Sequence, residues 1–265
     1  MESSRLSIAA VSLAPDLRTS LSRARQLGVR GVEVDARGGL DPALVTQTGL
    51  RQIRTWLDDH GLVVSAVAFR TRGGYADEDR LEGRIAATKS ALKLAHDLGA
   101  GVVLNHLGDL PPPPAPDAEP DPRWPLLLDV LTDLGRWGQR VGATLCAEAG
   151  AAGADDLLRV IAGLPEGSLS CDVVCGALLV HRHDPAETVH RLSGHIGFVH
   201  MTDAVAGSFA GRGRATPLGA GHVDLAGVLG GLEERGYRGW IGLEPADPRA
   251  AAAELSSAIE LLRGC

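Results

Sequence analysis

Short apolar runs alternate with amphipathic stretches along the chain, and this alternation limits the possible fold more than any other feature. A stretch with apolar residues near helical spacing follows each run, so eight predicted strands alternate with eight predicted helices. Such alternation indicates a parallel sheet with helices packed on its faces. The predicted strands cover residues 6–13, 31–34, 62–69, 102–104, 143–148, 168–172, 196–201 and 240–244.

Residues that favour helix ends support these boundaries. Asp-Pro pairs open three of the helical stretches, at residues 41–42, 184–185 and 247–248. Proline is favoured in the first turn of a helix, and glycine just after the last turn. Glycines such as Gly61 and Gly99 stand where two of the helical stretches end.

The length of the chain suits a closed barrel. Its 265 residues, 45% of them hydrophobic, are enough to bury a large core. We therefore predict the α/β class and a single (β/α)₈ TIM barrel domain over residues 1–265. An open, doubly wound sheet is the alternative, but residues 12–15 read Ser-Leu-Ala-Pro after the first strand, where a dinucleotide-binding sheet has a GxGxxG turn.

A proline-rich stretch at residues 111–125 interrupts the alternation. Eight of its fifteen residues are proline, which excludes a helix interior or a central strand. Strand and helix patterns resume directly after it. We therefore predict a stiff loop within the barrel domain rather than a linker between domains.

The charge and the apolar pattern of the chain disfavour several partners. The net charge is −7, and Lys89 and Lys93 are the two lysines of the sequence, so no basic surface for nucleic acid is expected. No apolar run approaches the roughly 20 residues needed to span a membrane, and residues 1–5 do not resemble a signal peptide. We expect a cytoplasmic protein with reduced thiols and a small-molecule partner, and a homo-oligomer stays open.

Four polar side chains stand at the ends of the last four predicted strands. They are Glu148, Asp172, His200 and Glu244. The carboxyl ends of the strands meet at one face of a TIM barrel, so these side chains are expected to converge. Converging carboxylates repel one another, and a divalent cation offsets that repulsion. Three carboxylates and one imidazole favour Mn²⁺, with Mg²⁺, Co²⁺ or Zn²⁺ as alternatives. Each residue could instead be a helix cap or the partner of an arginine.

Several further segments resemble one family. The sequence is similar to the sugar phosphate isomerase/epimerase family of the xylose isomerase-like TIM barrels, over most of the chain. The resemblance is carried by residues 95–100 (AHDLGA), 198–203 (FVHMTD), 217–224 (PLGAGHVD) and 236–244 (GYRGWIGLE). It implies that Glu148, Asp172, His200 and Glu244 are the metal ligands. It also implies that Glu148 and Glu244 are the catalytic acid and base, as in the ketose epimerases of the family.

The resemblance and the residues together predict a reaction class. We expect a divalent-metal-dependent isomerase or epimerase that acts on a sugar or polyol ketone by proton transfer through a metal-stabilised enediolate. One alternative is a lyase or dehydratase that acts on a keto-sugar or keto-cyclitol with the same metal site. A second alternative is a barrel that binds a small molecule without catalysis. A class I aldolase is disfavoured because neither lysine lies at a strand end.

Two positions depart from the pattern of the family. Cys175, three residues after Asp172, stands where many members have a histidine that contacts the substrate. Thr202 stands where the motif of the seventh strand often has lysine, a positive charge that some dehydratases use. We expect Cys175 to form part of the wall of the substrate pocket.

Three more residues are candidate substrate contacts. His106 ends the fourth strand, at a position that faces the site in many relatives. Arg212 and Arg214 lie in the glycine-rich loop 204–221, which we expect to fold over the barrel mouth. Weaker candidates at neighbouring strand ends are Phe69, Arg70, Asp35 and Arg37.

Overall fold

Eight parallel strands close into a barrel in the computed structural model of the protein, which describes residues 5–113, 119 and 121–264. The order around the barrel is β1-β10-β7-β6-β5-β4-β3-β2, and every pair of neighbours is parallel. This confirms the predicted (β/α)₈ TIM barrel. The barrel strands are β1 (Leu6–Ala9), β2 (Gly31–Asp35), β3 (Val63–Ala68), β4 (Val102–Asn105), β5 (Thr144–Ala149), β6 (Leu169–Val174), β7 (Ile196–His200) and β10 (Trp240–Leu243).

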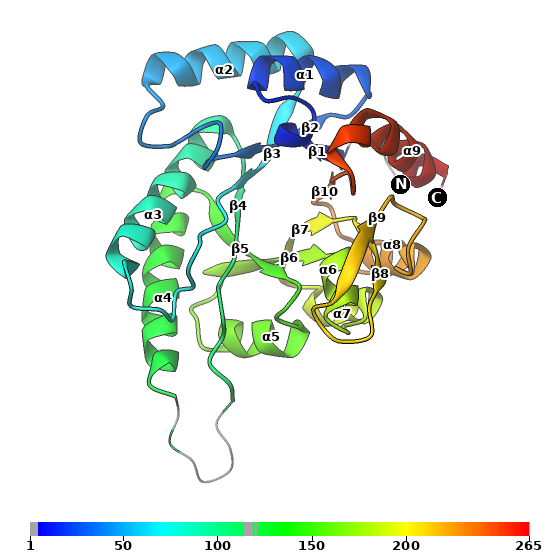
Figure 1. Cartoon of the computed structure of the whole chain (residues 1–265). Helices are drawn as coiled ribbons and strands as arrows, with labels where there is room; N and C mark the ends of the chain where they lie inside the picture. The colour runs from blue at the N-terminus through cyan, green and yellow to red at the C-terminus, as the bar shows by residue number, and fades with distance from the viewer. Residues whose placement is uncertain (1–4, 114–118, 120, 265) are drawn as a thin grey trace.

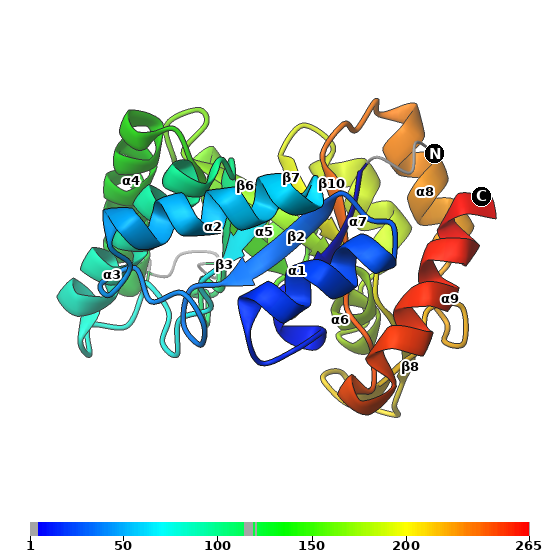
Figure 2. The same ribbon diagram turned by 90° about the horizontal axis from the view of Figure 1, so that it is seen from above.

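Helices surround the strands as an outer ring (Figure 1). Seen from above, α1 and α2 lie side by side on the outside of the barrel (Figure 2). No helix in the described part of the chain is long and apolar enough to cross a membrane. The helices are α1 (Leu17–Gln26), α2 (Gln47–His60), α3 (Leu81–Leu98), α4 (Arg123–Val141), α5 (Ala154–Ala162), α6 (Cys175–Val180), α7 (Pro185–Leu192), α8 (Leu225–Glu234) and α9 (Ala251–Gly264), with short 3₁₀ turns η2 (Ala10–Ser12) and η3 (Pro248–Ala250).

Side-chain hydrogen bonds cap the starts of α1, α2, α7 and α8. Asp184 caps α7 by accepting hydrogen bonds from the backbone N–H groups of Ala186 and Glu187, as the Asp-Pro pair predicts. The Asp-Pro pair at residue 41 acts differently. Asp41 accepts from Ala43 N within a turn, and α2 begins only after Thr46, which caps it. A helix start at residue 41 is therefore wrong by about one and a half turns.

Three further segments differ from their predicted structure. The first strand ends at Ala9 because the chain turns into η2 there, although the apolar run continues. The short helix α6 directly follows β6 and is not evident from the sequence pattern. The predicted proline-rich loop at 111–125 lies partly outside the described residues, and its last three residues already belong to α4.

A hairpin stands where a glycine-rich loop is predicted after β7. Strands β8 (Asp203–Ala206) and β9 (Gly213–Thr216) pair antiparallel. The buried carboxylate of Asp203 holds the segment that returns from the hairpin, because it accepts hydrogen bonds from Gly219 N, Gly221 N and Val223 N at 2.9 to 3.1 Å. The segment after β7 is thus a hairpin whose return is fixed by hydrogen bonds to the side chain of Asp203.

The inside of the barrel is filled by side chains. Ala66, Leu104, Cys146 and Phe198 form a buried cluster there, each 0% exposed. Gly242 on β10 lies against this cluster, and a Cβ added to it would come within 2.6 Å of the Phe198 ring. The strand that leads to Glu244 therefore depends on a residue without a side chain at position 242.

We predict that Gly242→Ala destabilises the protein by about 1–3 kcal/mol, because the added methyl group would overlap the buried ring of Phe198. Urea unfolding followed by circular dichroism measures the effect. Gly230→Ala is the matched control, since it lies in α8 with nothing within 4 Å of an added Cβ, and should be neutral or slightly stabilising. Equal unfolding free energies for the two variants would contradict the packing argument.

Candidate active site

Seven charged or polar side chains gather at the carboxyl ends of the barrel strands. Because all eight strands are parallel, their carboxyl ends lie at the same face of the barrel, and residues far apart in the sequence become neighbours there. On adjacent strands, Glu148 of β5 and Asp172 of β6 are register partners. The group comprises Glu33, Arg70, His106, Glu148, Asp172, His200 and Glu244.

His200 lies between two buried carboxylates. Its Nδ1 is 2.7 Å from Asp172 Oδ2 and its Nε2 is 2.8 Å from Glu33 Oε2. Both nitrogens can donate together only when the imidazole carries two protons. Burial opposes that charge, but the charges of Asp172 and Glu33 outweigh it and raise the pKa of His200 well above its ordinary value. The two contacts therefore favour the protonated form of His200, whose single positive charge offsets only part of the charge of its two carboxylate partners.

Arg70 is the second positive charge of the cluster. Its Nε donates to Glu148 Oε1, its Nη1 lies 3.5 Å from Glu33 Oε1, and its Nη2 lies 3.7 Å from Glu244 Oε1. Burial alone would lower the pKa of this guanidinium, but the three carboxylates raise it. One arginine side chain thus contacts carboxylates from three other strands.

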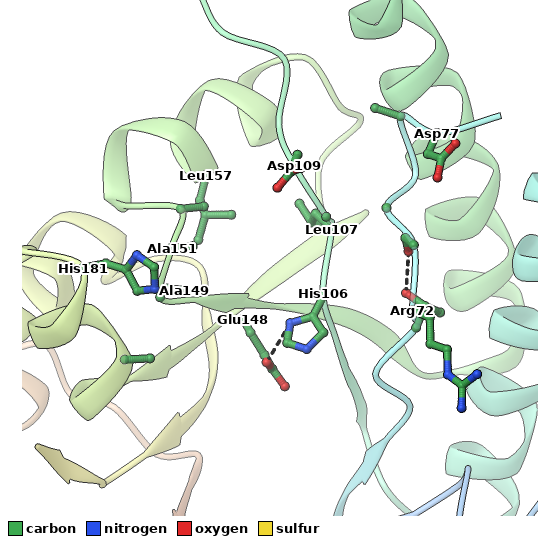
Figure 3. Close-up of a pocket in the computed structure, with 18 of the residues that line it drawn as sticks. Arg72, Asp77, His106, Leu107, Asp109, Glu148, Ala149, Ala151, Leu157 and His181 are labelled. Carbon is green, nitrogen blue, oxygen red and sulfur yellow. Dashed lines mark hydrogen bonds and ion pairs between the residues drawn. The ribbon is translucent and has the colours of Figure 1, made fainter. Parts of the chain in front are cut away.

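Glu148 is held ionised by a neighbour on each side. Its Oε2 lies 3.0 Å from Nδ1 of His106, a contact drawn in Figure 3. Burial would raise the pKa of Glu148, but the hydrogen bond from His106 and the charge of Arg70 lower it to about 2. The hydrogen bond to Glu148 in turn raises the pKa of His106.

Glu244 has the opposite tendency. Its burial raises its pKa, and the nearby charges of His200 and Arg70 only partly offset that effect. The two glutamates that the sequence suggests as an acid and base pair therefore differ in their affinity for a proton.

The cluster offers ligands for a cation. Glu33, His200 and Glu244 can each present one ligand atom, all within 4.8 Å of one another. Asp172 Oδ1 is buried and has no hydrogen-bond partner in the described part of the chain. A buried carboxylate oxygen of this kind is suited to bind a cation. Carboxylate oxygens with one imidazole nitrogen are ligands for Mn²⁺, Mg²⁺ or Zn²⁺. These residues therefore fit a divalent metal.

This candidate metal site overlaps the predicted one in two residues. His200 and Glu244 belong to both sets. Glu148 and Asp172 lie in the same cluster, but Glu148 faces Arg70 and His106, while Asp172 faces His200. Their roles as ligands stay predictions. Glu33 was missed, although a glutamate inside the otherwise buried strand β2 was a signal that could have found it.

A large cavity opens beside Glu148. It measures about 900 Å³, near the upper end of the usual size range for small-molecule sites. Figure 3 shows Glu148 and His106 pointing into it from neighbouring strand ends, with His181 and Arg72 on opposite sides. A second cavity of about 210 Å³ is lined by Glu33, Arg70 and Glu244 among others.

The other predicted substrate contacts do not line these two cavities. Cys175 is 0% exposed at the start of α6, and burial raises the pKa of its thiol to about 12. Thr202 Oγ1 accepts a hydrogen bond from Gly176 N, so it ties α6 to the end of β7. Arg212 and Arg214 are exposed on the hairpin. None of Cys175, Arg212 and Arg214 is among the described residues that line the two cavities, and their substrate roles stay predictions.

Solved structures with the same fold support the architecture. A xylose isomerase domain protein from Planctomyces limnophilus is 23% identical, with a TM-score of 0.85 over 99% of this chain and 96% of that one. A xylose isomerase-like TIM barrel protein from Mycobacterium smegmatis in complex with magnesium is 18% identical, with a TM-score of 0.77 over 98% and 95%. D-Psicose 3-epimerase from Clostridium cellulolyticum H10, solved with D-tagatose, is 13% identical, with a TM-score of 0.79 over 98% of both chains.

The family assignment follows from the sequence match. No curated protein matches the sequence. A family model described as a xylose isomerase-like TIM barrel matches residues 21–265. Because this match spans nearly the whole barrel, the protein belongs to the xylose isomerase-like TIM barrel family.

Proposed function

We propose that the protein is a divalent-metal-dependent isomerase or epimerase of a sugar or a related polyol ketone. One observation carries the proposal: two glutamates, Glu148 and Glu244, stand at the mouth of one barrel around the buried His200, and a large cavity opens beside Glu148. Members of this fold that are similar to the chain include an epimerase solved with a ketose, which supports a carbohydrate-like substrate.

The metal would be held by Glu148, Asp172, His200 and Glu244, with Glu33 close enough to take part. Mn²⁺ is the cation that this mixture of oxygen and nitrogen ligands favours. When bound, the cation supplies Lewis acidity that polarises the carbonyl group of the substrate. A nitrogen of His200 that held the cation would have to carry no proton.

The side chains of the protein carry the proton transfer. Glu148 is ionised and faces the large cavity, so it takes the proton from the carbon next to the carbonyl of the substrate. The electron pair of that C–H bond then forms the C=C bond of an enediolate. Glu244 returns a proton to the opposite face in epimerisation, and a proton delivered to the neighbouring carbon gives isomerisation. His106 holds Glu148 in place through the hydrogen bond to its Oε2.

A lyase or dehydratase is the second candidate, and His106 favours it. Its side chain is 49% exposed, faces the large cavity and lies beside the proposed base. A histidine in that position can give a proton to a departing hydroxyl group once the enediolate has formed. The two candidates share the first step and differ in where the second proton goes.

We predict that the metal-free protein binds Mn²⁺ and that Asp172→Asn weakens this binding at least about tenfold, since losses of this size follow even the removal of outer-shell partners of a metal. Isothermal titration calorimetry measures both affinities. Asp155→Asn makes the same chemical change at an exposed surface position and should leave the affinity unchanged. A native protein that binds no divalent metal at saturating concentrations would refute the metal-dependent function.

We expect Glu148→Gln and Glu244→Gln each to lower turnover by about 10²–10⁴-fold, because each removes one proton-transfer group. The assay follows deuterium incorporation from D₂O into a panel of ketopentoses and ketohexoses. Glu260→Gln, on the exposed surface of α9, is the matched control and should keep full activity. Full activity in either active-site variant would remove that glutamate from the mechanism.

Product analysis by NMR in D₂O separates the two reaction classes. An isomerase or epimerase gives a product of unchanged composition that carries solvent deuterium on the carbon next to the carbonyl or on its neighbour. Loss of water from the substrate would instead establish the lyase. A protein that binds sugars but neither exchanges nor dehydrates them would be the non-catalytic barrel.

A further inference from the structure

Arg70 lies where a metal would have to compete with it. Its guanidinium extends from the end of β3 across the barrel mouth and contacts Glu33, Glu148 and Glu244. These carboxylates come from three other strands, so the side chain joins opposite sides of the mouth. Glu33 and Glu148 are largely buried, whereas Arg70 is 35% exposed.

The partners of Arg70 are also ligand candidates. Glu33 and Glu244 belong with His200 to the cluster whose ligand atoms lie within 4.8 Å of one another. Glu148 is a ligand in the proposed function, and its Oε1 is turned to Arg70. A guanidinium and a divalent cation repel each other, and both draw on the same few oxygens. The guanidinium of Arg70 and a bound cation therefore compete for these carboxylates, and each weakens the binding of the other.

The contact between Arg70 and Glu148 also divides the space at the mouth. The larger cavity has Glu148 and His106 in its wall, whereas the smaller one has Glu33, Arg70 and Glu244. Glu148 thus lines the larger cavity and Glu33 and Glu244 the smaller one, and the Arg70–Glu148 contact joins the two walls. A guanidinium that leaves Glu148 would free that carboxylate to turn toward His200 and Glu244.

We propose that Arg70 is a resident counter-ion of the metal-free site, and that a divalent metal binds by displacing its guanidinium from Glu148 and Glu244. The inference rests on the proposed metal-dependent function and adds a specific role for Arg70 to it. Arg70 keeps the carboxylate cluster folded without metal and, as a consequence, weakens the affinity of the site for metal.

A supporting role for Arg70 predicts the opposite effect. If the guanidinium instead orients Glu148 as a ligand, its loss must weaken metal binding, as the loss of outer-shell partners does. If it competes with the metal, its loss must strengthen metal binding. The sign of the change in affinity therefore separates the two roles.

The test is a calorimetric titration of Mn²⁺ into metal-free wild type, Arg70→Gln, Arg70→Lys and Arg72→Gln, all as full-length protein. We expect Arg70→Gln to bind Mn²⁺ at least tenfold more tightly than wild type. Arg70→Lys keeps the charge but loses the forked donor group, so its affinity should lie between the two. Arg72→Gln removes the same charge two residues along the loop, from an exposed side chain in the wall of the larger cavity, and should change the dissociation constant less than twofold.

Thermal unfolding supplies a second readout. Without metal, Arg70→Gln should melt below wild type, because three carboxylates lose their shared partner, and saturating Mn²⁺ should raise its melting temperature by more than it raises that of wild type. If Arg70→Gln does not fold without metal, the affinity of Arg70→Lys for Mn²⁺ is compared with that of wild type instead. Tighter binding supports competition between Arg70 and the metal, and equal or weaker binding overturns it.

The outcomes distinguish two failures. Wild type that binds Mn²⁺, with Arg70 variants that bind equally or more weakly, would overturn the role of Arg70 and leave the proposed function intact. Absence of binding in wild type and in every variant would overturn the metal-dependent function itself.

Discussion

Repulsion among carboxylates at the barrel mouth is the constraint on which the site depends. Glu33, Glu148, Asp172 and Glu244 converge there from different strands, and Glu33, Glu148 and Asp172 are largely or fully buried. Carboxylates removed from water and brought together need positive charge nearby. In this structure Arg70 and His200 provide it, each by contacting more than one carboxylate. The barrel supplies a rigid frame on which so unfavourable a cluster can persist.

The convergence of the strand-end residues could be predicted because the fold places the carboxyl ends of all barrel strands at one face. Apolar runs that alternate with helical stretches indicate a barrel, and a barrel brings the residues after its strands together. Glu148, Asp172, His200 and Glu244 therefore converge as expected. Glu33 was missed because it lies inside β2, whereas the predicted ligands were taken from the ends of strands. Arg70 was noted as a weaker candidate, since a sequence gives no sign that its side chain will span the mouth and reach three other strands.

Other misses have local physical causes. The helix expected at residue 41 begins after Thr46, because Asp41 uses its carboxylate in a turn instead of a cap. The hairpin β8–β9 depends on Asp203, whose bonds reach backbone groups up to twenty residues away. Cys175 starts a short helix that packs it into the core, and its expected place in a pocket wall stays a prediction. Each of these depends on contacts that a linear pattern does not encode.

The same electrostatic balance connects the fold to the proposed chemistry. In the proposed function a divalent cation would bind among the carboxylates around one histidine once Arg70 is displaced, and two of those carboxylates would also move protons. The large cavity next to Glu148 offers a substrate room beside the proposed base. In the proposed function Cys175 and Thr202 would replace two side chains that the family resemblance leads one to expect near the site, and His106 in the wall of the large cavity would be a substrate contact.

A crystal structure of the Mn²⁺-loaded protein, with anomalous diffraction measured at the manganese edge, shows directly where the metal binds. We expect one strong anomalous peak at the barrel mouth, within coordination distance of His200, Asp172, Glu148 and Glu244. A loaded crystal without a peak at these residues, or with its manganese elsewhere on the protein, would contradict this expectation.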